Sequence, residues 1–354
     1  MIKYYTRACN FYYGRISKEK IKKKISLPLN GSKLISFDTI ELITRKKNKL
    51  IKIKDIKHLS SSLRKKILKD LKEITKKKNI KNLNFKSYPL LMGILNVTPD
   101  SFSDGGKYLK TNLANKHIKK LKKDGADIID IGGESTRPNS NTVNSIVEWN
   151  RIKSKLKFAK KNNIFVSLDT RKSLVLKNSL PLKIDLLNDV SGLNYDYRII
   201  NILKKSKIPF VLHHMRGTPK TMQNNPKYKN VLLDIYDFFE KKLKFIRDNK
   251  IKHKNIILDP GIGFGKNLKH NITILNQISI FHSLGFPIML GISKKKFIKD
   301  IASNNDSKNR TGGTISSSIH GLLQGIQILR VHDVNEVKQS IKVFNKILRE
   351  WNTY

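Results

Sequence analysis

The segment LLMGILNV, residues 90–97, is a short apolar run that ends in polar residues, and it sets the pattern for the rest of the chain. Seven runs of the same kind follow it: DIIDIGG (127–133), IFVSLDT (164–170), IDLLNDV (184–190), PFVLHHM (209–215), NIILDPG (255–261), PIMLGIS (287–293) and ILRVHDV (328–334). Near-continuous apolar runs of this length are typical of strands buried on both faces, as parallel sheets require. We therefore predict eight parallel strands.

Residues at helical spacing separate these runs, as in Ile146, Trp149, Ile152 and Leu156, and in Ile315, Ile319, Leu322 and Ile326. Eight strand–helix units in about 265 residues match the count and size of a TIM barrel. The prediction is an α/β fold in which residues 87–354 form a (β/α)8 barrel and residues 1–86 form a small basic N-terminal extension. A doubly wound open sheet is the structural alternative.

The composition changes near Ser87, and the chain before it is rich in lysine. Residues 34–44 and 50–56 are predicted to form a short strand pair. Behind the serines at 60–62, four apolar residues at spacings of four, four and three predict an amphipathic helix: Leu63, Ile67, Leu71 and Ile74. We interpret the extension as a small appendage that packs on the larger domain, and the sequence gives it no role.

The formal net charge of +45 raises the question of nucleic-acid binding. Of the 72 basic residues, 13 are Arg and 59 are Lys, and the lysines accompany abundant Ile and Asn throughout the chain. That pattern indicates codon bias rather than a surface built for phosphate, because phosphate recognition favours the bidentate fork of Arg. Residues 1–90 are denser in charge, with a net of +20, so nucleic-acid binding by the extension stays a minor alternative.

The single cysteine, Cys9, excludes an internal disulfide and any multi-cysteine zinc site. A reducing compartment suits such a chain. No apolar run reaches the roughly 18 residues that a membrane span needs, and residues 1–14 lack the apolar segment of a secretory signal. We predict a soluble, cytoplasmic protein without a membrane partner.

In a TIM barrel the active site lies at the carboxyl ends of the strands. The runs end in unusual polar residues: Asn96, Glu134, Thr136, Arg137, Asp169, Asn188, His213, His214, Asp259, Ser293, Lys295, Arg330 and His332. Any one of them could be a cap or a turn former, but eight such strand ends describe a rim built for a polar ligand. The rim mixes carboxylates and amides with a cationic group formed by Arg137, Lys295, Arg330 and, if protonated, His332.

Several familiar motifs fail on inspection. GIGFGKN, residues 261–267, is similar to a phosphate loop, but Pro260 replaces the first glycine and Asn267 replaces the Ser or Thr. No dinucleotide fingerprint has the required βαβ context. The sequence has no HExxH, and no serine lies in a GxSxG elbow, so nothing implies a covalent nucleophile.

Taken together, the motifs resemble those of the dihydropteroate synthase family. The matching segments, which appear in the family's order, are GILNVTPDSFSDGG (93–106), GADIIDIGGESTRP (125–138), SLDT (167–170), LLNDVSG (186–192), HHMRGTPKTMQ (213–223), LDPGIGFGKN (258–267), GISKKKF (291–297) and RVHDV (330–334). The resemblance implies a transferase that joins 6-hydroxymethyl-7,8-dihydropterin diphosphate to 4-aminobenzoate. The products are diphosphate and the dihydropteroate needed for folate synthesis.

The resemblance also implies roles for individual residues. Pterin would be bound by Asp169, Asn188, Asp259 and Lys295. Diphosphate would be bound by Asn96, Arg330 and His332, and the catalytic set would be Lys295, Arg330 and His332. The 4-aminobenzoate pocket would use Phe102, Thr136, Arg137, Pro138 and Ser293. The implied cofactor is Mg2+, held by Asn96 with Asp104 as a second candidate, and the implied assembly is a homodimer.

The sequence also departs from the family pattern. Many members carry Ser-Arg-Lys where this chain has Ser293, Lys294 and Lys295, and some place a serine next, where this chain has Lys296. The residue that contacts the aminobenzoate carboxylate is therefore open. A pterin-dependent methyltransferase on a related barrel is the alternative function, but the ESTRP, GFGKN and RVHDV segments favour the synthase.

Overall fold

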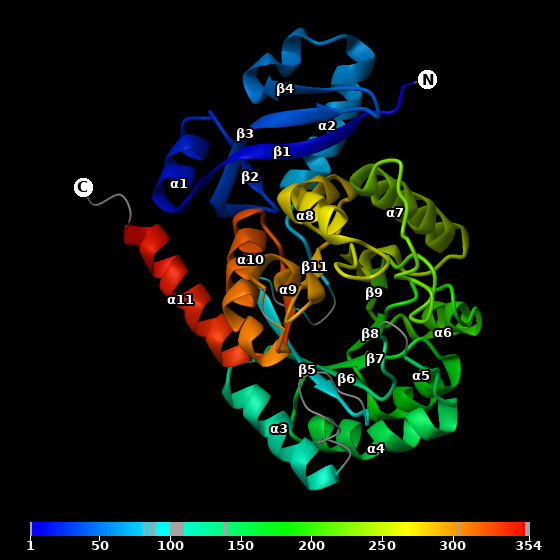
Figure 1. Ribbon diagram of the computed structural model, residues 1–354. Helices are drawn as coiled ribbons and strands as arrows, with labels where there is room; N and C mark the ends of the chain where they lie inside the picture. The colour runs from blue at the N-terminus through cyan, green and yellow to red at the C-terminus, as the bar shows by residue number, and fades with distance from the viewer. Residues whose placement is uncertain are drawn as a thin grey trace.

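The computed structural model describes residues 2–80, 83, 85, 89–99, 110–137, 140–303 and 305–350, except for the side chains of residues 253, 349 and 350. Its described residues form two sheets, an eight-stranded parallel sheet and a four-stranded antiparallel sheet. Figure 1 shows the parallel sheet at the centre of a ring of helices, with the antiparallel sheet of the extension outside that ring.

The parallel sheet confirms the predicted barrel, because each of the eight apolar runs contains one of its strands. The strands are β5 (Leu90–Asn96), β6 (Ile128–Gly132), β7 (Val166–Asp169), β8 (Leu186–Asp189), β9 (Phe210–His213), β10 (Ile256–Asp259), β11 (Met289–Gly291) and β12 (Ile328–Val331). Their order is β10-β9-β8-β7-β6-β5-β12-β11. The two end strands meet at a single parallel bridge between Leu258 and Ile288, which brings the sheet round into a barrel.

Helices alternate with these strands, as a right-handed β-α-β chain requires. They are α3 (Thr111–Lys123), α4 (Ser145–Lys161), α5 (Ser173–Ser179), α6 (Arg198–Ser206), α7 (Val231–Asp248), α8 (Leu268–Asn276), α9 (Lys296–Ala302), α10 (Thr311–Leu323) and α11 (Val334–Glu350). Short 3-10 turns lie at η4 (Leu180–Leu182), η5 (His253–Asn255), η6 (Ile278–Leu284) and η7 (Ser307–Arg310). The predicted stripe of α4 is buried at Ile152 and Leu156, whereas Ile146 in its first turn is exposed.

Apolar side chains fill the N-terminal mouth of the barrel, the end at which its strands begin. One buried cluster draws on the early positions of the strands: Leu90, Met92, Ile128, Leu186, Val211, Ile257, Met289 and Ile328. Ile80, Leu83 and Phe85, from the segment that leads into β5, pack against this cluster. Ile80, Leu83 and Phe85 therefore help to close the mouth.

The extension has a hydrophobic core of its own, between its sheet and a helix. Its elements are β1 (Tyr5–Tyr13), α1 (Gly14–Lys22), β2 (Leu27–Leu29), β3 (Ser32–Ile43), β4 (Asn48–Lys52), η1 (Ile53–His58) and α2 (Ser61–Thr75). The predicted strand pair and helix are present as β3, β4 and α2, although the second strand ends at Lys52 and η1 begins at Ile53. Strands β1 and β2 and helix α1 were not predicted from the sequence.

Strand β1 joins the extension to the outer wall of the barrel. The hydroxyl of Tyr5 donates to Asp237 on α7 at 2.9 Å, and the hydroxyl of Ser279 on η6 donates to the Ala8 carbonyl at 3.0 Å. At the far end of β1, the hydroxyl of Tyr13 donates to the carbonyl of Leu323 at 2.9 Å. Among the described residues, no helix has the length and apolar character that a membrane span needs.

Candidate active site

A partly buried guanidinium links several strand ends at the C-terminal rim, the end at which the barrel strands finish. Arg330 on β12 donates from Nε to Asp130 Oδ2 on β6 at 2.7 Å, and from Nη2 to Asp169 Oδ2 on β7 at 2.9 Å. Asn188 on β8 donates from Nδ2 to the same Asp130 oxygen at 3.0 Å. The structure thus brings together three predicted residues, Asp169, Asn188 and Arg330, through a fourth that was not predicted.

Asp130, which was not among the residues predicted from the sequence, is the central acceptor of this cluster. The available signal was a lone charged side chain inside the apolar run IIDIG. Two acceptor atoms, Asp130 Oδ1 and Asn188 Oδ1, are buried and have no hydrogen-bond partner within the described part of the chain. Because an unsatisfied buried acceptor costs about 1–3 kcal/mol, a bound donor would stabilise this site.

Burial also changes the acid–base character of the cluster. Burial, followed by the nearby Asp130 carboxylate, raises the pKa of Asp169, and the Arg330 guanidinium opposes that rise. Burial lowers the pKa of Arg330, but the Asp130 and Asp169 carboxylates outweigh it and raise the pKa above its ordinary value. Arg330 is therefore a permanent cation, held between the carboxylates of Asp130 and Asp169.

A second group converges beside Gly291, the last residue of β11. A Cβ built on this glycine would lie 3.8 Å from Asp259 Oδ2, 3.9 Å from Lys295 Nζ and 4.0 Å from Arg330 Cβ. Three predicted residues, which lie at or just after the ends of three different strands, therefore surround the position beside Gly291. Because glycine has no side chain, this position stays accessible. Arg330 belongs to both groups, so the two form one site.

The loop after β10 fixes Asp259 and Lys295. Asp259 Oδ1 accepts a hydrogen bond from the Gly261 backbone N–H at 2.8 Å. The ammonium of Lys295 donates to the Ile262 carbonyl and lies 4.5 Å from the centroid of the Phe264 ring. Burial raises the pKa of Asp259, against the opposing charge of Lys295, and burial lowers the pKa of Lys295 to about 7.

Ser293 and His332 form a pair at the edge of the site. Ser293 Oγ lies 3.0 Å from His332 Nδ1, and it accepts the His332 backbone N–H at 3.2 Å. Burial, followed by the charge of Arg330, lowers the pKa of His332 to about 3, and Arg137 contributes in the same direction. The imidazole is therefore neutral at pH 7 in the free protein, and the cationic group of the rim does not include it in that state.

The remaining predicted residues fall into two sets. Asn96 ends β5 opposite Gly132, which in turn pairs with Asp169, so the asparagine belongs to the same rim. Thr136 and Arg137 are partly buried in the segment after β6. Phe102, Asp104 and Pro138 lie outside the described residues.

Two rim histidines have structural partners. His213 Nδ1 lies 2.9 Å from the Val190 carbonyl, and His214 Nδ1 lies 3.0 Å from the ammonium of Lys266. Lys266 also donates to the carbonyls of Gly261 and Phe264, both at 2.9 Å. This buried lysine, in the segment that fails as a phosphate loop, instead organises the loop beside Asp259.

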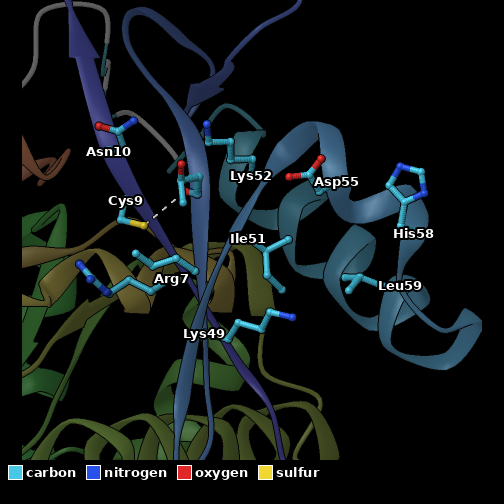
Figure 2. Close-up of a pocket in the computed structure, with 11 residues that line it drawn as sticks. Arg7, Cys9, Asn10, Lys49, Ile51, Lys52, Asp55, His58 and Leu59 are labelled. Carbon is cyan, nitrogen blue, oxygen red and sulfur yellow. Dashed lines mark hydrogen bonds between the residues drawn. The ribbon is translucent and has the colours of Figure 1, made fainter.

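A separate pocket of about 930 Å³ opens in the extension between its sheet and η1 (Figure 2). Its lining includes Cys9, whose thiol donates to the Thr39 carbonyl at 3.5 Å and whose pKa is raised by burial to about 11. Arg7, also in the lining, forms an ion pair with Glu41 at 2.6 Å. The pocket shares no residue with the rim site.

The barrel carries carboxylates, an amide and cations at its C-terminal rim. This arrangement is that of a TIM-barrel enzyme, whose active site lies at the carboxyl ends of the strands. The family model described as pterin binding enzyme matches residues 92–332. The dihydropteroate synthase of Synechocystis sp. is 38% identical over 260 residues, covering 73% of this chain and 90% of its own length. That of Escherichia coli K12 is 36% identical over 263 residues, covering 74% and 93%.

Solved structures agree with these relatives. The Yersinia pestis dihydropteroate synthase, in complex with a sulfonamide drug, has a TM-score of 0.72 and 35% identity, covering 76% of this chain and 96% of that one. The Thermus thermophilus enzyme, in complex with 4-aminobenzoate, has a TM-score of 0.67 and 31% identity, covering 75% and 96%. The chain belongs to the dihydropteroate synthase family.

Membership confirms the family, fold and function that the sequence predicted. The chain is a transferase of folate biosynthesis, and its function is the synthesis of dihydropteroate. The relatives give no support to the methyltransferase alternative.

Proposed function

We propose that the rim site binds a dihydropterin through its carboxylates and amide while its cations bind the diphosphate. The observation that carries this assignment is the convergence of Asp259, Lys295 and Arg330 beside Gly291, together with the bridge from Arg330 to Asp169. Carboxylates and cations thus face one point from different strands. A dihydropterin diphosphate has complementary ends, a ring rich in N–H donors and an anionic tail.

The ring has a 2-amino group beside a ring N–H, and these parallel donors suit a carboxylate. Asp259 is that carboxylate in our proposal, because its Oδ2 faces the shared point while Oδ1 is fixed by the Gly261 N–H. Asn188 supplies the unsatisfied Oδ1 acceptor, and Asp169 completes the polar contacts of the ring. Asp130 holds Asn188 and Arg330 in place.

The chemistry is a displacement at the pterin methylene carbon. The bond from that carbon to the diphosphate oxygen breaks and its electron pair leaves with the diphosphate. The amine nitrogen of 4-aminobenzoate then forms the new bond to carbon and loses a proton. Because the electron-rich ring delocalises positive charge, the protein needs no nucleophile and chiefly stabilises the departing anion, a role for Arg330, His332 and Lys295.

His332 begins this cycle neutral, so it acts first as a hydrogen-bond partner. A diphosphate placed beside the ring would favour the protonated form and raise its pKa, since an adjacent anion stabilises the imidazolium. Lys295, whose pKa is lowered to about 7, responds in the same direction. Substrate binding therefore increases the positive charge of the site when the leaving group needs it.

Mg2+ is the cofactor that we propose. The residues of the rim suit an ion that binds through few protein oxygens. The described residues contain no group of three His, Cys, Asp or Glu side chains that could hold a metal. Mg2+ commonly keeps several waters and binds through one or two protein oxygens plus substrate phosphates. Asn96 would supply the protein oxygen, with Asp104 as the second candidate, and the ion would neutralise charge on the diphosphate.

The second substrate, 4-aminobenzoate, is assigned to the rim beside Ser293, Thr136 and Arg137, together with Phe102 and Pro138. The influence of Arg137 on the pKa of His332 supports a position for its charge near the diphosphate end.

The experiment that tests this function is an assay of diphosphate release by the purified chain. Release should require both the dihydropterin diphosphate and 4-aminobenzoate, and it should fall when EDTA removes Mg2+ and return when Mg2+ is restored. Release that continues without 4-aminobenzoate, or a rate that EDTA leaves unchanged, would contradict the substrate or the metal assignment respectively.

Three further expectations remain proposals. A homodimer formed through outer helices can be tested by analytical ultracentrifugation. A division into an extension, residues 1–86, and a catalytic barrel, residues 87–354, is supported by the extension's own hydrophobic core, although Tyr5, Ile43 and Ile80 pack into the clusters of the barrel. A cytoplasmic location and small-molecule rather than nucleic-acid partners complete the assignment, and DNA binding by the chain that responds steeply to salt would argue against it.

A further inference from the structure

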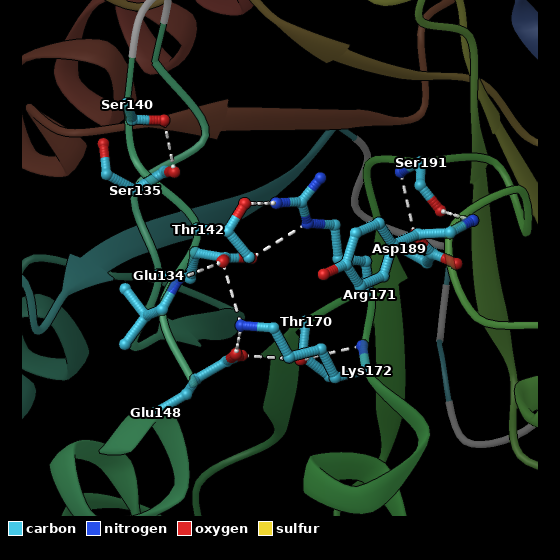
Figure 3. Close-up of polar contacts among 12 residues, drawn as sticks. Glu134, Ser135, Ser140, Thr142, Glu148, Thr170, Arg171, Lys172, Asp189 and Ser191 are labelled. Atoms are coloured by element: carbon cyan, nitrogen blue, oxygen red, sulfur yellow. Dashed lines mark hydrogen bonds and ion pairs between the residues drawn. The ribbon is translucent and has the colours of Figure 1, made fainter. Parts of the chain in front are cut away.

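Four charged side chains form a buried network behind the rim site, and the reaction described above does not use them. Figure 3 shows Glu134 from the segment after β6, Glu148 from α4, and Arg171 and Lys172 from the segment after β7. Lys172 Nζ contacts Glu134 Oε1 at 2.9 Å and Glu148 Oε2 at 2.5 Å, and Arg171 Nε contacts Glu134 Oε2 at 2.9 Å. We name these residues the charged quartet; their side chains are 0–5% exposed.

The quartet holds both ends of the segment 134–143. Glu134 begins that segment, and its Oε1 accepts the backbone N–H of Val143, the last residue, at 2.9 Å. Arg171 Nη2 approaches the Thr142 hydroxyl at 3.4 Å. A single buried carboxylate therefore closes the base of a segment that carries Thr136 and Arg137.

The same network reaches the pterin side of the rim. Glu148 Oε1 accepts the hydroxyl of Thr170 at 2.6 Å, and Thr170 directly follows Asp169. The Thr170 backbone N–H donates to the Asn188 carbonyl at 3.2 Å. The Arg171 guanidinium lies 4.1 Å from the ring centroid of Tyr195, in the segment after β8. Three consecutive rim segments are thus joined at one place.

The energetics argue for positioning rather than for stability alone. Burial raises the pKa of Glu134, but Arg171 and Lys172 outweigh it, so the pKa is lowered and the group is ionised. Burial raises the pKa of Glu148 above its ordinary value despite Lys172. Buried ion pairs of this kind are often no more stabilising than packed apolar residues, whereas removing one partner is costly. What the charges add is a fixed geometry.

We propose that the charged quartet sets the position of residues 134–137 and 140–143 and, through Thr136 and Arg137, the affinity of the 4-aminobenzoate subsite. This inference rests on the proposed role of that segment in binding 4-aminobenzoate. None of the four side chains contacts a reacting atom in our assignment, so they are positioning residues. Removal of Glu134 or Arg171 should separate the two substrates, because Glu148 keeps its hydrogen bond to Thr170 and the segments after β10 and β11 keep Asp259 and Lys295 in place.

The test uses Glu134→Gln in the full chain, because glutamine retains an oxygen for the Val143 N–H while it loses both ion pairs. We expect the KM for 4-aminobenzoate to rise about 10-fold or more, since small misplacements of binding groups have large effects. The Kd of the dihydropterin diphosphate should stay within about twofold. Backbone amides of residues 134–137 and 140–143 should exchange hydrogen about 10-fold faster.

The matched control is Lys160→Met. Lys160 lies on α4, as Glu148 does, but its ion pair with Asp185 at 2.6 Å is at the opposite end of the barrel, and its loss should change the affinity for neither substrate. Arg171→Met is the second variant, because Lys172 still bridges both glutamates, and it should give the same pattern with smaller changes. Glu134→Asp is a comparison that retains the charge, and it should recover part of the affinity for 4-aminobenzoate.

Each outcome decides the inference. Faster exchange with an increased KM for 4-aminobenzoate alone supports it. Unchanged exchange, equal losses for both substrates, or failure of both variants to fold would overturn it, the last because the quartet would then serve the fold as a whole. If the wild-type chain released no diphosphate, the proposed function would fail, and hydrogen exchange would still decide whether the quartet positions the segment.

Discussion

The two ends of the barrel are built from the same eight strands, and they differ in almost every physical respect. At the N-terminal mouth, Ile80, Leu83 and Phe85 pack onto apolar side chains from the beginnings of the strands. At the C-terminal rim, Arg330 bridges Asp130 and Asp169, and two buried acceptor atoms lack partners within the described residues. The mouth is closed mainly by apolar packing, although Gln327 Nε2 just before β12 lacks a partner among the described residues, whereas the rim gathers charged and polar groups that a ligand would satisfy.

The contrast shows how a closed barrel separates stability from chemistry. Burying an aliphatic side chain contributes about 1.5–3 kcal/mol, so the apolar mouth helps to stabilise the fold. The rim holds charges out of water, where electrostatic interactions are strong but desolvation is costly. Substitutions at the rim should therefore change ligand affinity most, and substitutions at the mouth should change the free energy of unfolding.

The largest effect is expected for Asp259→Ala. Loss of two charge-assisted hydrogen bonds, each worth about 1.5–3 kcal/mol, should weaken pterin binding by about 1,000-fold or more while the barrel stays folded. Calorimetric titration with the pterin measures the effect. The matched control is Asp127→Ala, because the Asp127 carboxylate accepts the Leu91 N–H at 2.8 Å near the mouth. Undiminished pterin affinity in Asp259→Ala would refute the assignment.

Arg330→Ala should produce the next largest effect, and it should distinguish the two parts of the substrate. Without the guanidinium, affinity for the dihydropterin diphosphate should fall about 100-fold, corresponding to about 2.7 kcal/mol, and affinity for free pterin should fall less than about 10-fold. Competition binding with both ligands measures the ratio. Arg198→Ala, which removes an exposed arginine, is the control. Equal losses for both ligands would count against a role in binding the leaving group.

At the mouth, Ile80→Ala should lower stability without changing catalysis. Ile80 is buried against the strand residues, and its truncation should cost about 2 kcal/mol of unfolding free energy, near the lower end for a buried isoleucine. Urea unfolding measures this loss, and kcat/KM for both substrates should stay unchanged. Leu50→Ala, at an exposed position of β4, should cost less than about 0.5 kcal/mol. A change in substrate affinity for Ile80→Ala would contradict the expectation that the mouth affects stability alone.

The sequence predicted the barrel well because its strands carry their signal locally. All eight apolar runs became strands, since a strand buried on both faces must be apolar along its length. Strand β1 was missed because its burial depends on a partner that is distant in the sequence. The ring of Tyr5 packs edge-on against the ring of Tyr236, with 5.1 Å between the ring centroids. No local pattern reports a contact of that kind.

The candidate site was predicted unevenly for the same reason. Residues at strand ends were found from position and motif, and the structure brings Asp169, Asn188, Asp259, Lys295 and Arg330 together. Asp130 was missed because its meaning depends on Arg330, which is 200 residues away. Likewise, Glu134 was placed among the polar residues of a rim built for a ligand, whereas its carboxylate is engaged by Arg171 and Lys172. The sequence could place polar residues at the rim, but only the structure shows which polar groups satisfy one another.

The smallest expected effect concerns Lys78, a buried charge close to the apolar mouth. Its ammonium donates to the Glu73 carbonyl, and burial, followed by the charge of Lys76, lowers the pKa to about 7. An unfolded lysine has a pKa of about 10.4, so between these values the unfolded chain binds more protons and stability should rise with pH. The cost of burying the ammonium is fully present below pH 7 and disappears above about pH 10.4.

Lys78→Met should therefore be more stable than the wild type by about 1 kcal/mol at pH 7, after allowing for the lost hydrogen bond to the Glu73 carbonyl. The difference should shrink as the pH rises toward 10. Urea unfolding at several pH values measures it, with Lys77→Met at the neighbouring exposed position as the control. A stability difference that does not depend on pH would mean that the ammonium is not desolvated. The mouth would then tolerate charge as the rim does, and the contrast between the two ends would lie in packing alone.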